Sequence, residues 1–225
     1  FIVGITCYSP EYYEVLNLAR QIKKINKRIT IVVGGIHPTL YPQDFIFAKS
    51  NIDVAVIGEG EITLCELIRY LDDKEQWPKI KSIAYFDKKL NKTIFTPPRP
   101  PCLNLDNIAK PAYHKINMEY YTVANPYAIR GVFTRSMYLL SSRGCPSACT
   151  FCVSKKLREV SGPGGTCRLR SPANLLTEIL SLKKDYQIDS FYFIDDLFTL
   201  NKEHVKKFCS LLKRFTLFWR SSAET

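Results

Sequence analysis

The sequence Arg143-Gly-Cys-Pro-Ser-Ala-Cys-Thr-Phe-Cys152 follows an apolar run at residues 137–140 and places three cysteines in the spacing C-x3-C-x2-C. Cysteine thiolates are the usual ligands of iron–sulfur clusters. Three thiolates in one short loop can reach three irons of a cubane, and the fourth iron is then left open for a substrate or cofactor. The spacing therefore predicts that Cys145, Cys149 and Cys152 hold a [4Fe–4S] cluster.

A zinc ion is the alternative occupant of this loop. Structural zinc takes four ligands, and the nearest further cysteine, Cys167, lies fifteen residues beyond Cys152. The eight cysteines of the chain follow no secretory signal, so we expect a cytoplasmic protein without a disulfide framework. No run approaches the ~20 apolar residues that cross a bilayer. The chain begins on strand-like sequence without an initiator methionine, so we expect a fragment of a longer protein.

Strands and helices are predicted to alternate on both sides of the cysteine loop. Apolar or β-branched runs predict strands, and Ser-Pro or Asn before an amphipathic segment predicts a capped helix start. Such alternation implies a parallel, doubly wound sheet. The predicted strands are residues 1–6, 29–33, 52–57, 137–140, 190–194 and a segment from about residue 217, with a β-hairpin at 82–86 and 93–96.

The cysteine loop resembles the signature of the radical S-adenosylmethionine (SAM) superfamily, which is CxxxCxxC with an aromatic residue before the last cysteine. Phe151 occupies that position, and the loop follows a predicted strand, as the family requires. The resemblance implies a partial (β/α) barrel and a cluster whose open iron binds the amino and carboxylate groups of SAM. It also implies reductive cleavage of SAM to a 5′-deoxyadenosyl radical, with the cofactors carrying the chemistry.

Other residues resemble the subgroup of this superfamily that carries a cobalamin-binding domain. Asp195 and Asp196 end a predicted strand, where the resemblance implies contact with the amino group of SAM. Phe151, Arg170 and Glu178 are likewise implied to belong to the SAM pocket. The alternative is that the aspartates cap a loop and that Arg170 and Glu178 serve helix capping and surface pairing.

The first part of the chain resembles a cobalamin-binding, flavodoxin-like domain. In that family a double glycine lets the backbone approach the nucleotide tail of cobalamin, and ligands bind beyond the carboxyl ends of the strands. The residues implied to contact cobalamin are Thr6, Gly34, Gly35, Gly58 and Glu59. No Asp-x-His-x-x-Gly loop is present, and His37 is not expected to ligate cobalt. The alternative for Gly34-Gly35 is a plain tight turn.

These readings divide the chain into three parts. Residues 1–76 are expected to form a cobalamin-binding domain without its first strands, and residues 77–130 a connector with a β-hairpin. Residues 131–225 are expected to form the beginning of a radical SAM barrel. The expected fold class is therefore α/β, with a partial flavodoxin-like (Rossmann-type) domain followed by part of a (β/α) barrel.

The resemblance implies a cobalamin-dependent radical SAM enzyme that transfers a methyl group to an unactivated carbon, with SAM, cobalamin and a [4Fe–4S] cluster as cofactors. Cyclisation or rearrangement by the same architecture is the alternative reaction. The implied partners are a small-molecule or natural-product substrate and an electron donor of the flavodoxin or ferredoxin type.

Two other classes of function fit less of the sequence. A tRNA methylthiotransferase would use three N-terminal cysteines, but Cys7 is followed by Tyr-Ser-Pro, and Cys65 is expected in the core. A zinc-binding or nucleic-acid-binding module would account for the net charge of +11. A solvated lysine-rich surface explains that charge equally well, so we expect no nucleic-acid partner.

Overall fold

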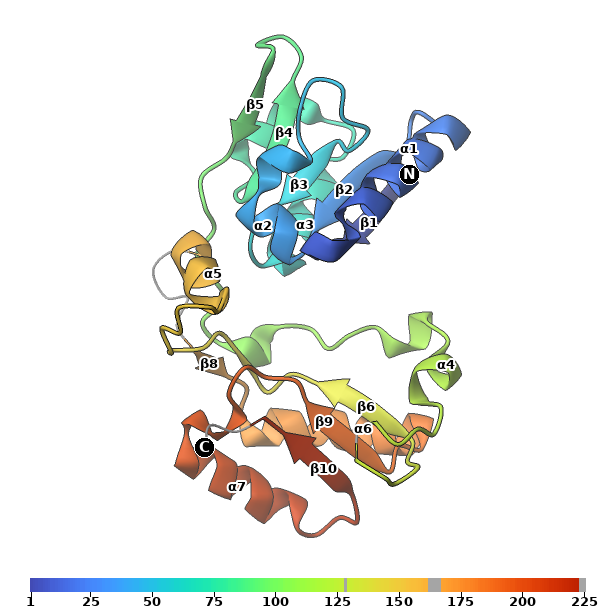
Figure 1. Ribbon diagram of the computed structural model, residues 1–225, viewed down its shortest axis with the longest axis vertical. Helices are drawn as coiled ribbons and strands as arrows, with labels where there is room; N and C mark the ends of the chain where they lie inside the picture. The colour runs from blue at the N-terminus through green and yellow to red at the C-terminus, as the bar shows by residue number, and fades with distance from the viewer. Residues whose placement is uncertain (128, 162–166, 223–225) are drawn as a thin grey trace. The chain divides into compact units, whose positions relative to one another are not determined.

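The computed structural model describes residues 1–127, 129–161 and 167–222. These residues divide into two compact units. The first unit comprises Phe1–Cys102 and Ser147–Gly165, and the second comprises Leu103–Pro146 and Thr166–Thr225. Both units contain strands and helices (Figure 1).

The first unit is built on a five-stranded sheet with the order β1-β2-β3-β4-β5. β1, β2 and β3 run parallel, with Thr6 beside Gly34 and Val33 beside Ala55. Apolar residues fill β2 and β3, as expected of strands that are covered on both faces. The strands are β1 (Ile2–Thr6), β2 (Thr30–Gly34), β3 (Val54–Val56), β4 (Ile83–Asp87) and β5 (Lys92–Phe95).

The predicted hairpin is formed by β4 and β5, and β4 pairs antiparallel with β3. Its turn is set by Asp87, whose side chain accepts the N–H groups of Lys89 and Leu90 at 2.8 and 3.0 Å. The hairpin thus extends the first sheet, whereas the sequence placed it in a connector. Hairpin patterns report pairing between neighbouring strands, and they do not reveal which third strand the hairpin joins.

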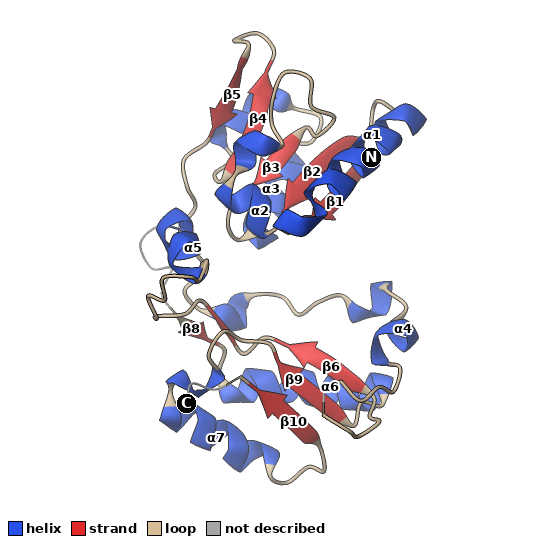
Figure 2. Ribbon diagram, viewed as in Figure 1, coloured by secondary structure: helices blue, strands red, loops and turns tan. Residues whose placement is uncertain are grey.

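Helices cover both faces of this sheet (Figures 1 and 2). Ile31 and Val33 lie in one core with residues of α1, and Val32 lies in the opposite core with Leu67 of α3. This alternation along one strand is what a doubly wound sheet requires. The helices of the first unit as a whole are α1 (Tyr12–Ile25), α2 (Ile36–Leu40), α3 (Gly60–Arg69) and α5 (Ser154–Ser161), with 3₁₀ turns at Ser9–Glu11, Pro42–Asp44 and Lys74–Lys79.

The second unit is built on three parallel strands with the order β10-β9-β6. Each strand pair is connected through a helix, which is the alternation predicted for the start of a barrel. The elements are β6 (Ser136–Leu139), β9 (Ser190–Phe193), β10 (Phe218–Ser221), α4 (Met118–Thr122), α6 (Pro172–Tyr186), α7 (Lys202–Leu212), a short antiparallel ribbon of β7 (Ser142–Arg143) and β8 (Arg168–Leu169), and 3₁₀ turns at Leu105–Asn107, Tyr113–Lys115 and Phe198–Leu200.

Caps and aromatic packing fix α6 and α7 in this unit. Ser171 Oγ accepts the Asn174 N–H at 3.2 Å and Asn201 Oδ1 accepts the His204 N–H at 2.9 Å, so these two predicted caps are confirmed. The predicted cap at Ser9 is not formed, because Ser9 lies inside a 3₁₀ turn that begins after Tyr8. Phe208 of α7 packs edge-on against Phe191 and Phe193 of β9. Among the residues that the structure describes, no helix is both long enough and apolar enough to span a bilayer.

Candidate functional site

The carboxyl ends of β1, β2 and β3 meet at one edge of the first sheet, because these strands are parallel and in register. Thr6, Gly34 and Gly58, three of the residues implied to contact cobalamin, lie at or just beyond these strand ends. Ligands of parallel α/β sheets bind beyond this edge. The structure therefore brings the three predicted loops together.

Gly34 and Gly35 have different surroundings at this edge. Gly35 has a φ of 101°, and a Cβ there would lie 2.8 Å from Thr6 Oγ1 and 3.0 Å from the carbonyl oxygen of Cys7. At Gly34 a Cβ would meet no atom within 4 Å. The protein itself therefore requires glycine at position 35, while the space beside Gly34 is open to a ligand.

Thr39 joins two of the loops, although nothing in the sequence distinguishes it beyond its place at the end of the glycine motif. Its buried hydroxyl donates to the Gly35 carbonyl at 2.7 Å and accepts the Gly58 N–H at 3.0 Å. A single side chain thus satisfies backbone groups from both glycine loops. This contact fixes the spacing between the two loops at the ligand edge.

His37 and Glu59 contribute to the structure of this edge in other ways. The His37 ring is buried, its Nε2 lies 2.9 Å from Asp44 Oδ2, and it packs against Tyr12. The His37 ring is therefore part of the packing of this unit, and its exclusion as a cobalt ligand stays a prediction. Glu59 precedes α3, and its Oε2 accepts the Cys102 N–H at 3.0 Å.

The cysteine motif supplies three thiols. All eight cysteines of the chain are described and none forms a disulfide. Cys145 is half-buried in the second unit, and Cys149 and Cys152 are exposed in the first. The Cys152 N–H donates to the Cys149 carbonyl at 3.1 Å, which closes a turn, and Phe151 within that turn is 92% exposed.

No three His, Cys, Asp or Glu side chains in the described part of the chain lie close enough together to hold a metal ion. The assignment of the three cysteines to a cluster therefore stays a prediction from their spacing and from the affinity of thiolates for iron. Cys167 lies within electrostatic reach of Cys145, and burial is the main cause that raises the pKa of its thiol. A neutral thiol is a poor metal ligand.

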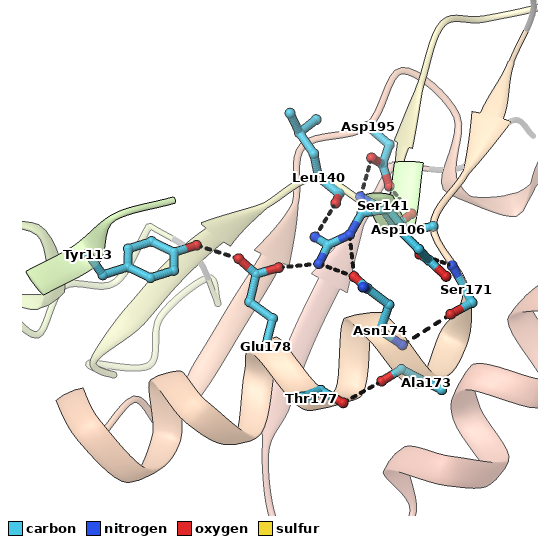
Figure 3. A network of polar contacts seen from close by, with 11 residues as sticks. Asp106, Tyr113, Leu140, Ser141, Ser171, Ala173, Asn174, Thr177, Glu178 and Asp195 are labelled. Atoms are coloured by element: carbon cyan, nitrogen blue, oxygen red, sulfur yellow. Dashed lines mark hydrogen bonds and ion pairs between the residues drawn. The ribbon is translucent and has the colours of Figure 1, made fainter. Parts of the chain in front are cut away.

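Asp195 follows β9 and is turned into the second unit, where it is only 3% exposed. Its Oδ1 accepts the N–H groups of Ser141 and Ser142 at 2.7 and 2.8 Å, and its Oδ2 accepts the Ser141 hydroxyl. Figure 3 shows Asp195 directed at Ser141. Asp196, the next residue, is exposed.

Arg170 and Glu178 are the other two residues predicted for SAM, and they form an ion pair with each other. Figure 3 shows Glu178 on α6, with Tyr113 directed at it. The Arg170 guanidinium donates to Leu140 O at 3.0 Å and to Asn174 Oδ1 at 2.6 Å, and it forms an ion pair with Glu178 at 2.5 Å. Tyr113 donates to the other Glu178 oxygen at 2.7 Å. These contacts tie the turn at Tyr113 to α6, and α6 to the end of β6.

The first unit also has a basic hollow of about 800 Å³ at the opposite edge of its sheet, where β2 and β3 begin. Lysines and aromatic residues line it, among them Lys24, Lys27, Lys88, Lys89 and Trp77. None of the residues predicted to bind cobalamin, SAM or the iron–sulfur cluster lines this hollow. The hollow is therefore separate from the candidate site.

Cys65 and the predicted connector at residues 77–130 differ from the sequence-based expectation. Cys65 is exposed on α3 instead of lying in the core. Residues 77–102 pack with the first unit, and residues 103–130 with the second. Both differences arise from long-range packing that local sequence patterns do not encode.

Comparisons with known proteins bear on both units. Residues 1–68 match the family model described as the B12 binding domain. The chain is 33% identical over 203 residues to an uncharacterized methyltransferase of Pyrococcus horikoshii, covering 90% of this chain and 41% of that protein. It is 31% identical to an anaerobic magnesium-protoporphyrin IX monomethyl ester cyclase of Rubrivivax gelatinosus, covering 95% of this chain and 37% of that protein.

Two solved structures share the arrangement of elements. The radical SAM methyltransferase TsrM of Kitasatospora setae aligns with a TM-score of 0.68 at 20% identity, covering 95% of this chain and 40% of that one. The cobalamin-dependent SAM radical enzyme OxsB aligns with a TM-score of 0.70 at 22% identity, covering 96% and 30%. These likenesses confirm the predicted fold class. The chain spans about two fifths of the length of the curated relatives above.

Proposed function

We propose, from the premise that this chain belongs to the cobalamin-binding radical SAM proteins, that it is part of an enzyme that transfers a methyl group from SAM to an unactivated carbon. One observation carries the proposal: a B12-binding domain at residues 1–68 and a C-x3-C-x2-C loop after a strand occur in the same chain. An iron–sulfur ligand set and a corrinoid domain together are what such a reaction requires.

The residues present have the chemistry that the three cofactors require. Cys145, Cys149 and Cys152 offer the thiolates that iron–sulfur clusters bind. The open space beside Gly34 and the neighbouring strand ends would accommodate part of cobalamin. When bound, the cluster would supply the electron that cleaves SAM, and cobalamin would carry the methyl group.

The chain's own residues hold and orient these groups. The turn that Cys149 and Cys152 close presents Phe151 to the surface, where its ring can pack against the adenosyl part of SAM. The exposed carboxylate of Asp196 is the proposed acceptor for the SAM ammonium. A small-molecule substrate and a flavodoxin-type or ferredoxin-type electron donor complete the proposal.

A cyclisation is the second candidate reaction, because the relative from Rubrivivax gelatinosus, which is 31% identical over 95% of this chain, is named a cyclase. The products of SAM separate the two reactions. A methyltransferase of the proposed kind releases S-adenosylhomocysteine as well as 5′-deoxyadenosine and methionine, whereas a cyclase that uses SAM only as a radical source releases 5′-deoxyadenosine and methionine without S-adenosylhomocysteine.

Cluster binding is the first experimental test. After anaerobic reconstitution, Ala at Cys145, Cys149 or Cys152 is expected to abolish the visible absorbance of the cluster and to lower the iron content. Cys209→Ala, in α7, is the matched control and should keep both. A full cluster in the Cys149→Ala variant would refute the ligand assignment, and zinc in place of iron in the unaltered protein would refute the function.

A further inference from the structure

We infer that Asp195 is a positioning residue that fixes the backbone leading into the cysteine loop, and that it does not bind SAM. The inference rests on the proposed function, since the loop is the proposed cluster site. It assigns different roles to the two adjacent aspartates that sequence reasoning treated alike. Asp195 makes its hydrogen bonds within the second unit, and Asp196 is the residue proposed to contact SAM.

Asp195 already accepts three hydrogen bonds from within the second unit. Three donors of Ser141 and Ser142 occupy its two oxygens, with both backbone contacts at 2.8 Å or less. A carboxylate that is 3% exposed is stable in a folded protein only when donors replace its lost water. Moving it to a SAM ammonium would leave the three donors unpaired in the interior.

The same backbone segment is also held from another direction. The Arg170 N–H donates to Ser141 O at 2.8 Å, and the Arg170 guanidinium donates to Leu140 O at 3.0 Å. The segment from Leu140 to Ser142 therefore lies between the end of β9 and the residues that precede α6. Opposed contacts of this kind define the position of a backbone more closely than either set alone.

This segment leads directly into the cysteine loop. β6 ends at Leu139, β7 begins at Ser142, and Cys145 follows three residues after Ser142. A change in the direction of the chain at Ser141 is transmitted directly to Cys145, because few rotatable bonds separate them. Asp195 thus acts on the first proposed cluster ligand through the backbone, without touching it.

Amide hydrogen exchange and cysteine alkylation test the inference in the protein without cofactors. Asp195→Asn removes the negative charge, so the N–H groups of Ser141 and Ser142 donate to a neutral amide oxygen and their hydrogen bonds become weaker. We expect exchange at the Ser141 and Ser142 amides to rise about tenfold or more. Alkylation at Cys145 should also become faster, while alkylation at Cys209 stays unchanged. Asp196→Asn is the matched control and should alter neither rate.

The reconstituted protein gives the second readout. Asp195→Asn should change the electron paramagnetic resonance spectrum of the reduced cluster before SAM is added, whereas Asp196→Asn should leave this spectrum unchanged and weaken SAM binding about tenfold. Ser141→Ala should reproduce part of the Asp195→Asn effect, and Ser141→Thr, which keeps the hydroxyl, should restore the normal spectrum.

Three outcomes would overturn the inference. The first is unchanged exchange and alkylation in Asp195→Asn. The second is a normal cluster spectrum with weakened SAM binding in that variant, which would make Asp195 a SAM ligand. If Asp195→Asn does not fold, unchanged exchange and alkylation in Ser141→Ala decide against the inference. Failure of the unaltered protein to bind a cluster would instead refute the proposed function, and the exchange data would still decide the role of Asp195.

Discussion

Gly34 and Gly35 are adjacent in the sequence, but only one of them needs to be glycine for the protein to fold. Gly35 combines a φ of 101° with a close approach to Thr6 and Cys7, whereas Gly34 has neither constraint. Cobalamin contact and backbone geometry were both plausible reasons for a double glycine. The structure distinguishes the two reasons, because only Gly35 has a backbone conformation and close contacts that require glycine.

Gly34→Val is therefore the informative change at the cobalamin edge. We expect the variant to fold with nearly unchanged stability and to lose corrinoid, because its side chain fills the open space beside the strand end. Retained cobalt content, measured by elemental analysis of the folded variant, would show that this space is not used by the ligand.

Gly35→Ala serves as the contrasting variant. The backbone conformation at this position costs about 1–3 kcal/mol for a residue with a Cβ, and the contacts with Thr6 and Cys7 add to that cost. Urea denaturation should show this loss of stability without any ligand present. A loss of cobalamin in Gly35→Ala would thus report on folding and not on direct contact.

At the scale of secondary-structure elements, α6 is held by a polar network that starts outside it. Tyr113, in a 3₁₀ turn, donates to Glu178 of α6, and Glu178 also pairs with Arg170. Burial, followed by the hydrogen bond to Glu178, raises the pKa of the Tyr113 phenol above its usual value. The neutral phenol is therefore the form that stabilises the folded state.

This raised pKa predicts a pH dependence of stability. The folded-state pKa lies above the unfolded one, so the contribution of Tyr113 is complete below pH ~10 and is lost as the pH rises above it. Tyr113→Phe should cost about 1.5–3 kcal/mol at neutral pH. The difference between the two proteins should shrink at alkaline pH, as measured by urea denaturation at each pH. A difference that does not change with pH would contradict the predicted titration of Tyr113.

At the scale of the whole molecule, the two units have separate hydrophobic cores. The cores of the first unit contain Val33 and Leu67, and the core of the second unit contains Phe193 and Phe208. Each core is formed within its own unit, although the chain passes from one unit to the other more than once. We therefore expect the units to respond separately to changes in their cores.

Phe208→Ala tests this expectation. Phe208 is completely buried among aromatic rings, so the cavity should cost about 3–5 kcal/mol. Hydrogen exchange should become faster in β9 and α6 and remain unchanged in β2. Leu67→Ala, in α3, should show the opposite pattern. Equal loss of protection in both units from either variant would mean that they unfold as one.

The sequence by itself determined the alternation of strands and helices and the capped starts of α6 and α7, and it is the source of the predicted cluster role of the cysteine loop. These features depend on local patterns: apolar runs, cap residues and the spacing of three cysteines. A resemblance carried by a few motifs was also enough to predict the two cofactor domains. All of this information lies within short stretches of chain.

Only the tertiary structure decided which candidate site residues make hydrogen bonds within the protein and which are exposed to a ligand. Asp195 and Asp196 are equivalent in the sequence, yet one accepts three internal hydrogen bonds and the other is exposed. Thr39 forms hydrogen bonds with both glycine loops, which is possible only because folding brings these loops to the same sheet edge. Such roles depend on donors and acceptors that are distant in sequence, and a local pattern contains no information about which of them folding brings together.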